Sequence, residues 1–257
     1  MAKIVLQSFS IIGKHHIQLS RINSTNKYAT DMIAKSKPIE GTVISAHYQY
    51  EGRGQIGRFW ESEAKKNILC SVILYPKFLS ARNQFYLNIA ISLAIYDFIS
   101  FYIDEKISIK WPNDIYVGEK KIAGILIQNT LVGKTIRSSI IGLGVNINQD
   151  AFDSNIPNPT SLLLENNKTY NIDILNKKLF DCLNQRYFDL KNNHELLKKE
   201  YLSHLYRKGV KSDFILENEQ IFKGVITDID DIGQLIITNL EGEKLFFGYR
   251  EIRFVID

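Results

Sequence analysis

The sequence predicts an α+β fold, in which a large domain of strands and helices is followed by a small antiparallel β domain. Three observations support this prediction. A glycine-rich loop at 49–60 lies between two strand-like runs, a strong helical pattern covers 82–102, and residues 210–256 alternate in short strands and turns. The 257 residues suffice for one large and one small domain, and the composition changes near Gly209. We therefore expect domains at 1–208 and 209–257.

The loop at 49–60 is the most informative stretch. It runs from Gln49 through Gly52, Arg53, Gly54, Gln55, Gly57 and Arg58 to Trp60. Glycines let backbone N–H groups converge on an anion because no Cβ interferes. Arginine pairs with phosphate or carboxylate, and tryptophan offers a flat face for a base. The pattern indicates a loop that closes over a nucleotide or an acyl adenylate.

Two other interpretations of this loop were weighed. The spacing of Gly52, Gly54 and Gly57 matches a dinucleotide fingerprint, which requires a strand before it and a helix after it. Residues 58–67 are mostly polar with no helical stripe, and a strand follows at 68–75, so a dinucleotide site is disfavoured. A surface hairpin loop is the simpler alternative, but it does not require two arginines and a tryptophan together.

The elements before this loop begin with a predicted strand at 15–20 and a second one at 42–48. Between them, Ser24-Thr25-Asn26 opens a helix that runs to about Ser36. Ser24 is a natural N-cap. A helix N-terminus with small hydroxyls also binds polar ligands. Both interpretations of this triplet are open.

A strand at 107–111 carries a candidate site residue, Lys110. Strand alternation places Ile107, Ile109 and Trp111 on one face and Lys110 on the other. Pro112-Asn113-Asp114 ends the strand with turn chemistry. A lone lysine on a strand is usually solvated, but the Trp-Pro-Asn-Asp sequence that follows favours a site at the strand end.

Two further strands, at 122–128 and 135–146, contain internal glycines. These are Gly124, Gly142 and Gly144. Glycine inside a strand indicates close approach of a ligand or another backbone, or else a β-bulge. A turn is predicted at 131–134 between the two strands. Helices are predicted at 161–165, 172–191 and 194–206, before the small β domain begins.

Composition excludes several classes of protein. The net charge of +4 is too small to indicate a nucleic-acid partner. Cys70 and Cys182 lie in apolar runs, which favours buried reduced thiols. We find no signal-peptide profile and no uninterrupted apolar stretch of membrane-spanning length, so we expect a cytoplasmic protein. Motifs for a phosphate-binding loop, a zinc protease helix and a nucleophile elbow are not found.

The motifs also occur in an order typical of one family. They are Ser24-Thr25-Asn26, Gln49 with Gly52-Arg53-Gly54, Gly57-Arg58 with Trp60, Lys110-Trp111-Pro112-Asn113-Asp114, Lys121 to Leu126, and Gly142 to Asn148. This set closely resembles the biotin–protein ligases (biotin–[acetyl-CoA-carboxylase] ligases). The resemblance runs from about residue 14 to the C-terminus, and the Lys-Trp-Pro-Asn-Asp and Gly-Arg-Gly motifs together make it specific.

The resemblance implies a catalytic domain like that of class II aminoacyl-tRNA synthetases, with a largely antiparallel sheet, followed by an SH3-like domain. It implies that biotin and ATP form biotinyl-5′-AMP, with Mg²⁺ bound mainly through the ATP phosphates. The biotinyl group then passes to a lysine of a biotin carboxyl carrier protein of acetyl-CoA carboxylase or another biotin-dependent carboxylase. By the same resemblance we expect a monomer or a weak homodimer.

The resemblance also implies residue roles. Lys110 and Arg53 are the expected catalytic residues, since they match groups that bridge the biotin carboxylate and the α-phosphate. The expected biotin-binding residues are Ser24, Thr25, Asn26, Gln49, Gly52, Arg53, Gly54, Gln55, Lys110 and Gly124. The expected nucleotide-binding residues are Arg53, Arg58, Trp60, Lys110, Lys121 and Asn146. No residue is assigned as the base for the acceptor lysine.

The chain departs from the family pattern at two points. The position after Gly-Arg-Gly is often arginine in the family and is Gln55 here. We expect looser retention of the adenylate, unless Arg58 compensates. Some members carry an N-terminal helix-turn-helix domain and repress biotin genes. Here the Ser24-Thr25-Asn26 motif comes close to the start, so we expect a monofunctional enzyme that binds no operator DNA.

Two rival functions were considered. A lipoate–protein ligase shares the fold and the adenylate chemistry, but its Arg-Arg-x-Ser-Gly-Gly-Gly-type loop is not found in this sequence. A nucleic-acid-binding module needs aromatic and basic residues interleaved on a barrel face. Residues 243–253 show this pattern only faintly. The better interpretation is that they form the barrel core and a surface that docks on the large domain.

Overall fold

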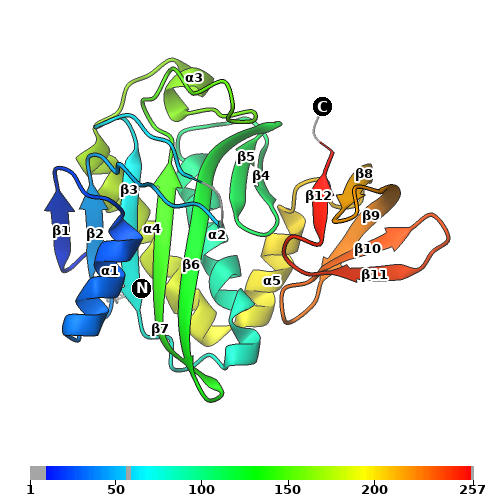
Figure 1. Ribbon diagram of the computed structural model, residues 1–257, viewed down its shortest axis with the longest axis horizontal. Helices are drawn as coiled ribbons and strands as arrows, with labels where there is room; N and C mark the ends of the chain where they lie inside the picture. Colours follow the sequence, from blue (N-terminus) through cyan, green and yellow to red (C-terminus); the bar gives the residue numbers. More distant parts are fainter. Residues whose placement is uncertain (1–9, 56–58, 256–257) are drawn as a thin grey trace, which may run out of the picture.

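The computed structural model describes residues 10–55 and 59–255 and contains two sheets. The larger sheet has the strand order β1-β2-β3-β7-β6-β5-β4 (Figure 1). Its strands are β1 His16–Leu19, β2 Val43–Ala46, β3 Ile68–Leu74, β4 Ile107–Lys110, β5 Asp114–Val117, β6 Lys120–Val132 and β7 Thr135–Val145. Only β1 and β2 pair in parallel; the other neighbours are antiparallel.

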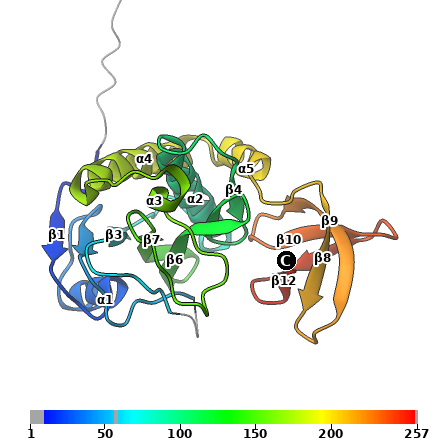
Figure 2. The same cartoon turned by 90° about the horizontal axis from the view of Figure 1, so that it is seen from above.

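Helices cover the two faces of this sheet unequally. Figure 2 shows α2, α4 and α5 on one face and α1 on the other. The helices are α1 Thr25–Lys35, α2 Phe85–Ser100, α3 Leu162–Asn166, α4 Ile172–Asn192 and α5 His194–Ser203. Helix α1 packs Ala29 against Ile44 and Ile73 of the sheet. Only a short row of apolar residues on α1 is needed for this contact, because the helix buries one narrow face against the sheet.

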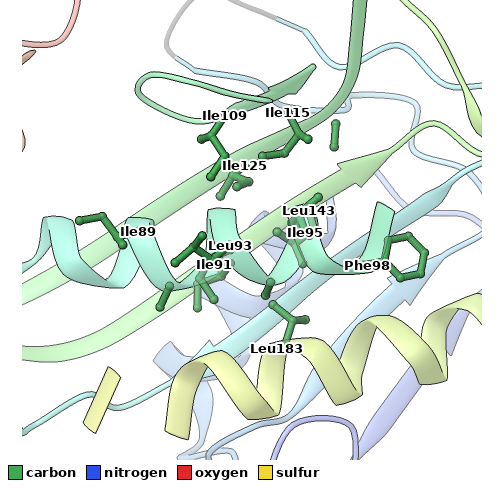
Figure 3. Close-up of a cluster of buried hydrophobic side chains, with 14 of the residues drawn as sticks. Ile89, Ile91, Leu93, Ile95, Phe98, Ile109, Ile115, Ile125, Leu143 and Leu183 are labelled. Atoms are coloured by element: carbon green, nitrogen blue, oxygen red, sulfur yellow. The ribbon is translucent and has the colours of Figure 1, made fainter. Parts of the chain in front are cut away.

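Helix α2 forms the centre of the main core. Its residues are apolar on almost every side, as expected for a helix covered all round. Figure 3 shows Ile125 and Leu143 of the sheet on one side of α2 and Leu183 of α4 on the other. Strand β3 is buried along its whole length for the same reason, since the helices on both faces of the sheet exclude water from it.

The smaller sheet is antiparallel, with the strand order β11-β10-β9-β8-β12. Its strands are β8 Lys211–Leu216, β9 Ile221–Ile229, β10 Leu235–Asn239, β11 Lys244–Phe247 and β12 Ile252–Phe254. Trp111 Nε1 donates to the carbonyl of Gly233 at 2.9 Å, which joins the end of β4 to the β9–β10 turn. The change of sheet supports the domain boundary that we propose after residue 208.

Most predicted elements are confirmed, with shifts at their ends. The strand predicted at 122–128 extends from Lys120 to Val132, so the turn predicted at 131–134 narrows to Gly133 and Lys134. Gly133 has φ +58°, which glycine adopts without strain. The helix predicted at 194–206 ends at Ser203. The next regular element after the loop at 49–60 is β3, so no helix follows the glycines within the described residues.

Both cysteines are buried and unpaired, as predicted. Burial raises the pKa of Cys70 to about 12, because the thiolate would lose its hydration. In the described part of the chain, no helix is long and apolar enough to cross a membrane.

Candidate active site

The start of helix α1 is capped by a residue from the glycine-rich loop. Ser24 occupies the N-cap position in extended conformation, but its side chain makes no capping hydrogen bond. Instead Thr25 donates to Gln49 Oε1 from its backbone N–H at 2.7 Å and from its hydroxyl at 3.0 Å. The capping interpretation of Ser24 is therefore wrong for its side chain. Gln49 takes over this task and ties the loop to the helix.

A buried polar layer lies beneath this helix start. Ser71 Oγ hydrogen-bonds with Thr25 Oγ1 at 2.7 Å and with Asn26 Oδ1 at 2.6 Å. Asn26 Nδ2 donates to Gln128 Oε1 at 3.1 Å. The sequence analysis missed Ser71 and Gln128. Ser71 carried a detectable signal, because it is the one serine or threonine within the apolar run at 68–75.

Side chains fill the space left by the strand glycines. A Cβ at Gly144 would lie 2.3 Å from Trp60 Cε2, and a Cβ at Gly124 would lie 2.8 Å from Trp60 Cζ3. A Cβ at Gly142 would lie 2.3 Å from Asn26 Oδ1. All three distances are too short for a real contact. The prediction was close approach of a ligand or another backbone, or else a β-bulge; the structure shows instead that an indole ring and an amide side chain lie against these glycines.

Two buried polar atoms in this region lack a hydrogen-bond partner among the described residues. They are Trp60 Nε1, a donor, and Asn146 Oδ1, an acceptor. The other side of the Asn146 amide is satisfied, since Nδ2 donates to the carbonyl of Thr160 at 2.9 Å. Buried polar groups are rarely left unpaired in proteins. These two atoms therefore offer one donor and one acceptor that no described residue uses.

Gly52 closes the glycine-rich loop at its base, and its expected contact with biotin stays a prediction. The N–H of Trp60 donates to the carbonyl of Gly52 at 3.0 Å, which closes the loop at its base. A Cβ at Gly52 would lie 2.2 Å from the Trp60 carbonyl oxygen. Gly52 is buried and lies outside the lining of the cavity described below. Its small size permits the loop closure.

Lys110 lies at the end of β4 among aromatic rings. Its Nζ donates to Tyr116 Oη at 3.0 Å and lies 5.2 Å from the centroid of the Phe254 ring. Burial lowers the pKa of Lys110 to about 8, because the ammonium has lost most of its hydration, although the nearby Asp114 carboxylate opposes this effect. An anionic ligand beside Lys110 would therefore stabilise its charged form.

Lys121 is the second lysine of the site. Its Nζ forms an ion pair with Asp114 Oδ1 at 2.7 Å and lies 5.5 Å from the centre of the Trp60 ring. The turn that precedes Asp114 is tied to β6, because Asn113 Nδ2 donates to the carbonyl of Ile125 at 2.6 Å. These contacts position the two lysines on β4 and β6, the two strands that flank β5 in the sheet.

These residues line one cavity of about 1070 Å³. The predicted site residues on its wall are Ser24, Thr25, Asn26, Gln49, Arg53, Gly54, Gln55, Trp60, Lys110, Lys121, Gly124 and Asn146. Arg58 lies outside the described residues. The structure adds Tyr116 and a group from the C-terminal domain: Tyr249, Arg250, Ile252, Arg253 and Phe254. The sequence analysis treated residues 243–253 as barrel core and docking surface, so it missed this wall.

The sequence profile of the Biotin/lipoate A/B protein ligase family matches residues 19–146. The chain is 30% identical over 241 residues to the bifunctional ligase/repressor BirA of Bacillus spizizenii, which covers 92% of this chain and 73% of that protein. The chain belongs to the biotin/lipoate A/B protein ligase family.

Other relatives point to the biotin branch of this family. The biotin–[acetyl-CoA-carboxylase] ligase of Mycobacterium tuberculosis is 28% identical, covering 86% of this chain and 83% of that protein. The biotin protein ligase from Aquifex aeolicus, solved in complex with biotin and ATP, superposes with a TM-score of 0.78 at 23% identity. That match covers 94% of this chain and all of that chain. The predicted α+β fold and the predicted membership of the biotin–protein ligases are confirmed.

The contact between Trp60 and the strand glycines leads to a prediction for this ligase. Gly144→Ala should displace the indole, because the added methyl group overlaps it, and should cost roughly 1–3 kcal/mol of stability. The tryptophan emission maximum should move to longer wavelength as Trp60 becomes hydrated. Gly248→Ala is the control, because a Cβ there meets only the flexible Glu251 side chain at 3.3 Å. An unchanged emission maximum in Gly144→Ala would contradict the packing described here.

Proposed function

We propose that this cavity joins biotin to ATP as biotinyl-5′-AMP and then transfers the biotinyl group to a lysine of a carrier protein. The observation that supports this best is the convergence of Arg53, Lys110 and Lys121 on one cavity beside the polar start of α1. The first step brings a carboxylate to a polyphosphate, which like charges oppose. Cations held in place before the substrates bind offset this repulsion at little reorganisation cost.

In the proposed first step, a carboxylate oxygen of biotin attacks the α-phosphorus of ATP, and the bond to pyrophosphate breaks. Lys110 lies between the two reacting groups and stabilises the charge that develops on the phosphoryl oxygens. Arg53, which is exposed on the loop at the cavity wall, is proposed to bind the same groups. The buried amide and hydroxyl layer at Thr25, Asn26 and Ser71 is suited to the polar ring of biotin.

The nucleotide is proposed to occupy the side of the cavity lined by Trp60, Lys121 and Asn146. The unpaired Trp60 Nε1 and Asn146 Oδ1 offer one donor and one acceptor there. In residues 10–55 and 59–255, no group of three or more His, Cys, Asp or Glu is arranged to hold a metal ion. We therefore propose that Mg²⁺ enters with ATP, held mainly by its phosphates, where it would neutralise phosphate charge.

In the second step, the amine of the acceptor lysine attacks the acyl carbon, an amide bond forms and AMP leaves. We propose the biotin carboxyl carrier protein of acetyl-CoA carboxylase or of another biotin-dependent carboxylase as the acceptor, in the cytoplasm. The enzyme is proposed to act as a monomer or weak homodimer and without DNA binding.

The decisive test is biotin-dependent exchange of labelled pyrophosphate into ATP, with lipoate as a parallel substrate. Lys110→Ala should lower the exchange rate by about 10²–10³-fold, the usual effect of removing a group that stabilises transition-state charge. Lys120→Ala should retain the wild-type rate, since Lys120 is exposed and does not line the cavity. Exchange with lipoate but not with biotin would contradict the biotin ligase proposal and indicate a lipoate ligase. Full activity in Lys110→Ala would remove the role assigned to this lysine.

The low pKa of Lys110 predicts a pH dependence of biotin binding. Below about pH 8 the free enzyme already carries the ammonium, so an anionic ligand binds without proton uptake. Above that pH the lysine must take up a proton when the carboxylate binds, so affinity should fall by up to about tenfold per pH unit. Calorimetric titrations at pH 9 in two buffers of different ionisation enthalpy measure this uptake. Equal heats in both buffers would contradict the prediction.

Gln55 predicts faster loss of the intermediate. Its amide can hydrogen-bond to the adenylate but cannot pair with the phosphate charge, whereas arginine does both. Dissociation of biotinyl-5′-AMP should therefore slow by about fivefold or more in Gln55→Arg, in line with a charge-assisted hydrogen bond. Gln55→Glu should accelerate release through repulsion. Equal dissociation rates for the wild type and Gln55→Arg would count against this account.

A further inference from the structure

The C-terminal domain reaches Lys110 through one aromatic side chain. Phe254 lies on β12, on the side of the small sheet that faces the large domain (Figure 1). Its ring centroid lies 5.2 Å from Lys110 Nζ. The ring of Tyr116, on β5, lies 4.7 Å from the same atom. The ammonium therefore lies between an aromatic ring of each domain, although Lys110 and Phe254 are far apart in the sequence.

Neighbouring contacts fix the position of the Phe254 ring. Strand β12 pairs with β8, and Phe254 lies opposite Phe214 with a ring distance of 5.4 Å. Tyr206, from the segment that joins the two domains, packs on it at 5.7 Å. The next residue, Val255, accepts a hydrogen bond from Arg207 Nη1 at 3.0 Å. The ring is therefore held by its own domain as well as by the connecting segment.

A second contact from the same domain supports the residue that follows Lys110. Trp111 Nε1 donates to the carbonyl of Gly233 in the β9–β10 turn. Gly233 has φ +94°, and a Cβ there would lie 2.4 Å from the Phe85 ring of α2. Asp231 of the same turn pairs with Lys198 of α5 at 2.9 Å. The C-terminal domain thus contacts two consecutive residues, Lys110 and Trp111, through two separate segments.

We propose that Phe254 is a positioning residue, through which the C-terminal domain holds Lys110 in the place required for adenylate formation. The inference rests on the role proposed above for Lys110. Phe254 need not touch biotin or ATP, because it acts on the lysine. Its ring attracts the ammonium through the negative face of its π-system and restricts the long, flexible side chain. It also limits the access of water to the ammonium.

The charged and titratable groups around Lys110 come mainly from the large domain and the connecting segment. Asp114 and Tyr116 lie on β5, Lys121 lies on β6, and Glu119, Tyr206 and Arg207 complete the set closest to it. Arg250 and Arg253 of the C-terminal domain line the same cavity. Replacing Phe254 alters none of these charges. A change in Lys110 behaviour in a Phe254 variant therefore reports on the ring itself.

The test compares Phe254→Ala and Phe254→Tyr in the full chain, with Phe222→Ala as a matched control. Phe222 is also a ring of the C-terminal domain, stacked on Phe214 at 5.5 Å and on Phe247 at 5.6 Å, and it does not line the cavity. Phe254→Ala should lower kcat of pyrophosphate exchange by about tenfold, with smaller changes in the KM values for biotin and ATP. Phe254→Tyr keeps a ring and should stay within about threefold of the wild type. Phe222→Ala should lower the Tm but preserve kcat.

A second readout does not depend on activity. In protein labelled with ¹³Cε-lysine, the Lys110 resonance is identified by its loss in Lys110→Gln, and its titration is followed by NMR. In Phe254→Ala this titration should move to higher pH, because water regains access to the ammonium. In Phe222→Ala it should not move.

The outcomes separate this inference from the function on which it rests. A wild-type kcat and a wild-type titration in Phe254→Ala would overturn it. So would a Phe222→Ala variant that reproduces both changes, since the effect would then be one of domain stability. Full exchange in Lys110→Ala would overturn the role of Lys110 itself and with it the catalytic part of this proposal.

Discussion

The packing of helix α2 between the large sheet and helices α4 and α5 is the constraint on which the site depends. This helix is apolar on almost every side, and its side chains are packed against neighbours nearly all round. A shift or rotation of the helix would therefore disturb packing on several sides at once. Its side chains also reach the C-terminal domain, because Phe85 contacts Gly233. Both the end of β4, which carries Lys110, and the β9–β10 turn, which supports Trp111, are therefore positioned against one rigid element.

The site combines a closely packed floor with the glycine-rich loop. The floor is built from strand glycines that accept the Trp60 indole and the Asn26 amide, and from hydroxyl and amide groups that satisfy one another. The loop is joined to that floor at both ends, by Gln49 at the start of α1 and by Gly52 at Trp60. A polar floor that already holds its hydrogen-bond geometry does not have to reorganise when a ligand binds.

Lys110 lies where the two sheets of the molecule meet at one cavity. A lysine at a strand end has a fixed backbone but a flexible side chain of four carbons. Here the Tyr116 ring of the large domain and the Phe254 ring of the C-terminal domain both lie close to the end of that side chain. The same burial weakens the hydration of the ammonium, and its lowered pKa is the electrostatic sign of that loss.

The sequence by itself determined the element order, the glycine-rich loop between two strands, and the set of motifs that identifies the family. These are local features, since strand alternation, helical spacing and glycine clusters are properties of neighbouring residues. The tertiary structure alone decided that Gln49 rather than Ser24 caps α1, that Ser71 lies beneath Asn26, and that Phe254 faces Lys110. Such contacts join residues far apart in the chain, as Trp111 and Gly233 are, 122 positions apart. No local pattern specifies them, because they arise only when the sheet, helix α2 and the C-terminal domain pack together.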